Sequence, residues 1–209
     1  TVLLLSGVDR WNAWREERPG RVVDLAEVNL SKSDLAGANL SNVRFSALGG
    51  SDLSFANLAG ADLSGASMNH SALTGADLSE SNMNHAVLAM TNLEEARLIG
   101  VDARNASFME ANLKNADLTG MSAAGANLYH ADLRGVNLKG ADFTGADLRG
   151  VDFRGATGWR TATFRCADIT GIQSSPEFLA CARLAGGIEL FSASAAEHKE
   201  AREECMSRT

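Results

Sequence analysis

The chain has few of the residues from which most catalytic and metal sites are built. Its 209 residues include 4 histidines, 3 cysteines and 1 tyrosine. The histidines have neither the spacing of metal ligands nor the arrangement of a catalytic triad. The sequence also contains no phosphate-binding G-x-x-x-x-G-K-(S/T) motif and no nucleophile elbow around a serine. We therefore expect a protein that is not an enzyme and that has no cofactor and no metal site.

Positive charge and long apolar runs are also scarce. Lys and Arg number 19 against 26 Asp and Glu, a formal charge of −7, which disfavours direct binding of nucleic acid. No apolar run approaches the roughly 20 residues that cross a bilayer, so no membrane association is expected. Cys166, Cys181 and Cys205 show no metal-ligand spacing, and we expect reduced thiols. These features together predict a cytoplasmic protein.

In contrast, a five-residue repeat is abundant. An apolar residue returns at every fifth position from Leu53 to Phe153, usually with a small residue two places before it, Asp or Asn between them, and Gly two places after it. A helix has 3.6 residues per turn and a flat strand alternates with period two, so neither keeps such a stripe on one face. The pattern predicts a solenoid with the large and small apolar residues inside, Asp or Asn facing water, and glycine at the corners. A disordered Gly/Ala-rich tract is the alternative, and the regular leucine spacing argues against it.

The units at 61–65 (A-D-L-S-G), 116–120 (A-D-L-T-G) and 146–150 (A-D-L-R-G) resemble the consensus of the pentapeptide repeat proteins. The resemblance covers about residues 23–169 and implies an all-β solenoid, a right-handed quadrilateral β-helix with one pentapeptide per side and four per coil. Repeat centres number 5 in a first register, 21 in the unbroken run and 2 after it, which at that ratio gives about seven coils and a rod of roughly 35 Å.

The repeat is interrupted twice. Three extra residues separate Phe45 from Leu53, around Gly49 and Gly50, and predict a bulged corner or a short loop. After Phe153 the pattern loosens and resumes one residue out of step at Phe164.

Three segments follow from this organisation: an N-terminal helical cap at 1–22, the β-helix at 23–172, and a C-terminal helical tail at 173–209. A solenoid leaves the apolar end of its first coil open unless a cap covers it. We predict a short helix over residues 7–18 as that lid, with Trp11 and Trp14 as the plug. The alternative is an exposed aromatic pair that holds a ligand.

The C-terminal tail has two interpretations. Ser175, Pro176 and Glu177 form a good helix start, and a second helix is expected from Ile188. The tail could cap the last coil. It could also pair two copies into a homodimer, because its apolar side chains exceed what one coil end needs. The candidate dimerisation residues are Phe178, Leu179, Leu190 and Phe191.

One side of the rod departs from the polar consensus and predicts a partner-contact strip. His70, Met90, Met109, Tyr129 and His130 fall at equivalent or adjacent corner positions in successive coils, and we call these five residues the contact strip. Exposed Met and Tyr are enriched in the cores of protein interfaces. Protonation of His70 and His130 near pH 6 is expected to weaken the contact. Relaxed selection on a tolerant surface is the alternative.

The function that these observations favour is a non-enzymatic scaffold for a protein–protein interaction. The resemblance supplies an alternative, because one branch of the family mimics duplex DNA, binds DNA gyrase and protects it from quinolones. Mimicry requires a continuous acidic face. Two sides of the rod carry a net charge of only −2 and the other two are near neutral, while basic residues gather toward the carboxyl end.

Overall fold

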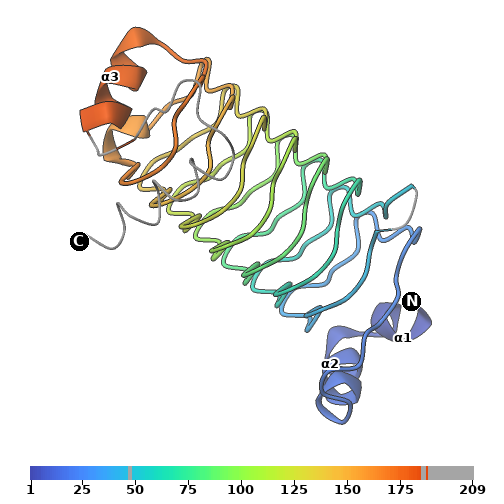
Figure 1. The fold of residues 1–209 in the computed structure, drawn as a ribbon. Coiled ribbons are helices and arrows are strands. Elements are labelled where there is room, and N and C mark those ends of the chain that lie inside the picture. Colours follow the sequence, from blue (N-terminus) through green and yellow to red (C-terminus); the bar gives the residue numbers. More distant parts are fainter. Residues whose placement is uncertain (47–48, 185–186, 188–209) are drawn as a thin grey trace.

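The structure, a computed structural model, describes residues 1–46, 49–184 and 187. The chain winds into a long β-helix, with helices α1 (Val2–Leu5) and α2 (Val8–Glu16) at one end and α3 (Pro176–Leu184) at the other (Figure 1). A short 3-10 helix, η1 (Trp159–Thr161), interrupts the last part of the winding. No helix in the described part of the chain has the length and apolar character that crossing a bilayer requires.

Four ladders of parallel bridges hold the coils together. Bridged residues are 20 positions apart through most of the chain, as in Asp52 with Ala72 and Ala72 with Asn92, so each coil has four five-residue sides. Within the described residues these pairs are isolated bridges separated by turns, and not extended strands. We number the sides 1 to 4 by the residues that begin their ladders, which are Asp24, Asn29, Asp34 and Asn39. The predicted solenoid is confirmed.

Each five-residue unit forms one side and one corner of a coil because each of its positions has a distinct structural role. The large and small apolar residues point inward, as Leu113 and Ala111 do with exposed fractions of 0% and 1%. The Asp or Asn between them is more than a water-facing group, because its side-chain oxygen accepts a hydrogen bond from the N–H two residues later and closes a turn. In Asp62 this bond, from Ser64 N, is 3.0 Å long. The corner residue then takes a left-handed conformation, with φ of 64° at Gly65.

Both interruptions lie where the sequence predicts them. Asn29 pairs with Asp52, 23 positions away, because three extra residues intervene. Asp142 pairs with Thr163, 21 positions away, because η1 adds one residue.

Side chains of α2 complete the exposed edge of side 4. Trp11 Nε1 donates to Asn39 O at 2.7 Å, Asn12 Oδ1 accepts from Asn39 N at 2.8 Å, and Arg15 Nη2 donates to Ser41 O at 2.6 Å. In later coils the equivalent groups pair with the backbone of the preceding coil. These three side chains therefore make the hydrogen bonds that the backbone of a preceding coil makes elsewhere in the rod. Trp11 is only 2% exposed, so it is not free to hold a ligand.

At the other end, α3 packs on the last coil. Phe178 is 2% exposed, and its ring centre lies 4.9 Å from that of Phe153 and 5.5 Å from that of Phe164. Leu179 is partly buried against the same core. Phe178 therefore contacts its own coil and is not on the surface of the single chain. Leu190 and Phe191 lie outside the described residues, and pairing of two copies through the tail stays a prediction.

The cysteines differ from the expectation of three reduced thiols. Cys166 is fully buried and disulfide-bonded, whereas Cys181 is a free, half-buried thiol.

Candidate protein-contact surface

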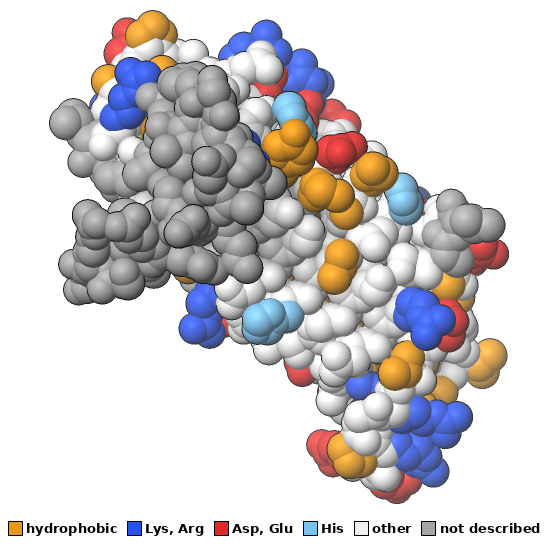
Figure 2. Space-filling view, viewed as in Figure 1, with side chains coloured by type: hydrophobic (Ala, Val, Ile, Leu, Met, Phe, Trp, Pro, Cys, Tyr) orange, Lys and Arg blue, Asp and Glu red, His pale blue; other side chains and the backbone are white. Residues whose placement is uncertain are grey.

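The structure brings the five residues of the contact strip together at one corner of side 1. His70, Met90 and His130 occupy the corner position of successive or alternate coils, with left-handed φ of 55° to 60°. Met109 and Tyr129 occupy the position just before the corner. Figure 2 shows hydrophobic side chains grouped on this face of the rod near histidines.

Exposure of these side chains is uneven. Met90 is 46% exposed, Met109 and Tyr129 are half-buried, and both histidines are exposed. Val87, 37% exposed, lies in the ladder of side 1, three residues before the corner residue Met90. We did not single out Val87 from the sequence, although an apolar residue in a slot that usually holds Asp, Asn or Ser was a usable signal.

Tyr129 is held firmly by its neighbours. Its ring meets His130 edge-on with ring centres 4.2 Å apart, and the Arg149 guanidinium carbon lies 5.0 Å from its centre. Arg149 donates from Nε and Nη2 to the carboxylate of Asp147 at 2.8 and 2.6 Å, and this hydrogen bonding raises the pKa of Arg149. The imidazole of His130 covers Gly150, where an added Cβ would lie 2.6 Å from the ring. A rigid aromatic group of this kind loses little conformational entropy on binding.

Charged side chains on side 2 form a ladder of alternating sign. Arg134 pairs with Asp132 at 2.5 Å and reaches Asp152 in the next coil at 3.7 Å, while Arg154 pairs with Asp152 at 2.6 Å. The hydrogen bonds from Arg134 and Arg154 lower the pKa values of Asp132 and Asp152, respectively. Asp132 and Asp152 are therefore paired with cations within the rod, and these pairs interrupt any continuous negative track on side 2.

The same pairing predicts an acid-sensitive contribution to stability at Asp102. Hydrogen bonds from Arg104 lower the pKa of Asp102 to about 2. A carboxylate with a lowered pKa stabilises the fold above its ordinary value near 3.9 and loses that contribution as the pH falls through the folded-state pKa. We expect Asp102→Asn to lower the thermal midpoint much more at pH 7 than at pH 2. An equal decrease at both pH values would contradict this assignment.

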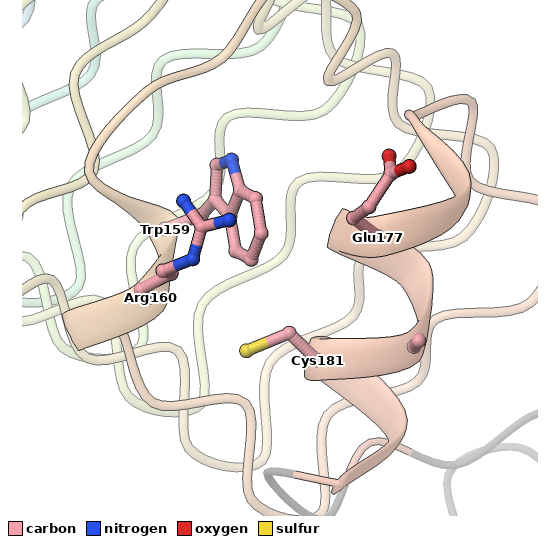
Figure 3. A pocket seen from close by; sticks show the side chains of 5 residues that line it. Trp159, Arg160, Glu177 and Cys181 are labelled. Carbon is pink, nitrogen blue, oxygen red and sulfur yellow. The ribbon is translucent and has the colours of Figure 1, made fainter.

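The described residues contain no cluster of metal-ligating side chains. A hollow of about 520 Å³ lies between η1 and α3, lined by Trp159, Arg160, Glu177, Ala180 and Cys181 (Figure 3). The Arg160 guanidinium already stacks on Trp159 at 4.3 Å. None of the described residues that line the hollow is a histidine.

The family model described as pentapeptide repeats (8 copies) matches residues 23–47, 51–89, 86–121 and 124–157. The chain belongs to the pentapeptide repeat family. Among solved structures, this pentapeptide repeat protein is similar to a trypsin-treated variant of the plasmid-mediated fluoroquinolone resistance protein QnrB1, at 20% identity over 80% of this chain and 98% of that chain, with a TM-score of 0.44.

Two further pentapeptide repeat proteins are similar. HetL, involved in heterocyst differentiation regulation in the cyanobacterium Nostoc sp. strain PCC 7120, shares 25% identity over 78% of this chain and 89% of its own, with a TM-score of 0.25. A protein of the Arabidopsis thaliana thylakoid lumen shares 24% identity over 88% of this chain and 92% of its own, with a TM-score of 0.27. A search of curated proteins found no match.

Proposed function

We propose that this pentapeptide repeat protein is a non-enzymatic scaffold, a right-handed quadrilateral rod of about seven coils, that binds a protein partner through the contact strip. The observation that carries the proposal is the contiguous apolar surface of Met90, Met109 and Tyr129, with Met90 46% exposed. Contiguous exposed apolar groups mark interaction sites more reliably than scattered ones. Methionine and tyrosine are also the residues that interface cores prefer.

The alternative, a DNA mimic that protects gyrase from quinolones, has weaker support. A mimic needs acidic groups free to replace phosphates. On side 2, Asp132 and Asp152 are instead paired with Arg134 and Arg154, and on side 4 Asp102 is paired with Arg104 at 2.6 Å.

The test is loss of partner binding when the strip is made polar. We expect the double change Met109→Ser and Tyr129→Ser to abolish capture of the protein's partner from extracts of the organism that makes it. The thermal midpoint should change by only a few degrees, because both side chains are half-buried surface groups.

The matched control is Ile99→Ser. Ile99 is half-buried in the same slot of the repeat as Met109, but on side 3. Capture should survive this change. If the Met109/Tyr129 variant still captures the same partner as the wild type, the contact lies elsewhere on the rod.

A further inference from the structure

The corner N–H groups of the contact strip are already hydrogen-bonded within the rod. Met90 N donates to Met109 O, Glu110 N to Tyr129 O, and each of these bonds is 2.9 Å long. His130 N likewise donates to Arg149 O at 2.9 Å. A partner strand can add only where N–H and C=O groups are unpaired. Because the corner N–H donors are already used, the strip offers no full ladder to a strand, and a segment that satisfies its own backbone, as a helix does, suits it better.

The spacing of the strip suits a helix that lies along the rod. Successive coils are stacked about 4.8 Å apart, and successive helical turns rise about 5.4 Å. One apolar residue per turn at positions i, i+4 and i+7 would therefore meet Met90, Met109 and Tyr129 in three consecutive coils. Helix-in-groove recognition uses anchors of this spacing.

An acid without a partner lies within this surface. Glu110 occupies the corner between Met90 and His130 and is exposed, with a φ of 56°. Among the described residues no cationic group lies within ion-pair distance of it. The nearby Arg149 is held by Asp147. A negative charge at the centre of an apolar contact calls for a cation on the other side, because an unpaired buried charge is costly.

We infer that the partner of the contact strip presents an amphipathic helix, whose apolar side chains cover Met90, Met109 and Tyr129 and whose Lys or Arg pairs with Glu110. This inference rests on the proposed function and specifies the chemistry of the partner.

The experiment uses the full chain as the target for a displayed library of stable helices with randomised outward positions. We expect selected binders to carry apolar residues at i, i+4 and i+7 with a Lys or Arg among them. One selected binder is then synthesised, and its affinity is measured for the wild type and for Glu110→Lys. Reversal of the charge should weaken binding by about tenfold or more, and exchanging the binder's cation for Glu should restore it.

Glu95→Lys is the matched control, since Glu95 is an exposed corner glutamate on side 2 with a φ of 59°. Lysine is tolerated at such corners, as Lys32 shows with the same φ of 59°. Binding to Glu95→Lys should stay within about twofold of wild type.

Three outcomes overturn the inference: no helical binder is enriched, the binder loses its helical circular dichroism on binding, or Glu110→Lys binds as well as Glu95→Lys. If Glu110→Lys is harmless while the Met109/Tyr129 double variant loses binding, the partner chemistry is wrong but the proposed function stands. If the double variant also binds normally, both fail.

Discussion

Replacement of Leu113 by Asp should destabilise the rod by several kcal/mol, because it places a carboxylate without a partner in an apolar core. Leu113 is 0% exposed, and the residues that stack above and below it, Leu93 and Leu133, are equally buried. The measurement is the free energy of unfolding from urea titrations followed by circular dichroism.

Asp117→Ser is the comparison variant, four residues further along the same coil. Asp117 Oδ1 accepts hydrogen bonds from Thr119 N at 3.0 Å, from Thr119 Oγ1 at 2.6 Å and from Asn137 Nδ2 at 3.1 Å. We expect a loss of about 1 kcal/mol, since serine keeps an oxygen that can close the turn more weakly. Equal losses for the two variants would refute the inward orientation of Leu113.

The second large effect is expected at the N-terminal end. Trp11→Ala should cost about 3–5 kcal/mol, the range for removal of a buried large aromatic side chain. It also leaves Asn39 O without the indole donor that stands 2.7 Å away. Trp11→Phe should fall between the wild type and Trp11→Ala, because it keeps most of the apolar packing and loses the hydrogen bond.

Trp14→Ala provides the control on the same helix. Trp14 is only half-buried, and the guanidinium groups of Arg18 and Arg21 lie over its ring at 5.3 and 5.5 Å. Its loss should lower the free energy of unfolding clearly less than the loss of Trp11, with both variants measured by the same urea titrations. If the two tryptophans prove equivalent, the edge pairing of α2 is not what stabilises the first coil.

The repeat alone predicted which side chains face the interior of the rod and which face outward. A five-residue period fits neither a helix nor a flat strand, so every large apolar position had to face one interior. The same counting located the three-residue insertion before Leu53 and the one-residue slip before Phe164, since both appear directly as changes of spacing.

Contacts that depend on docking could not be predicted in the same way. The sequence indicated a helix near Trp11, but it did not indicate that Asn12 and Arg15 would bond to backbone atoms of Asn39 and Ser41, 26 or 27 positions away. That pairing depends on where α2 lies against the coil. The turn-closing role of residues such as Asp62 was missed for a different reason: an outward side chain was read as solvated, although Asx residues often bond to their own backbone.

The contact strip could be predicted from the sequence only in part. Its corner residues could be aligned from the repeat alone, because equal spacing places them in one row. Val87 and the fixing of Tyr129 by Arg149 and Asp147 depend on neighbouring rows, which a count along one row does not reveal.

The 20-residue spacing of the ladders also limits how the gene can change in length. Loss or gain of a single pentapeptide would rotate every later unit by a quarter turn about the rod axis. His130 would then no longer align with His70, and the row would be split between two faces. Duplication of a whole coil preserves the azimuth of every residue and only lengthens the rod. Insertions and deletions therefore keep a straight binding surface only when they add or remove whole coils, so the length of that surface can change only in steps of one coil.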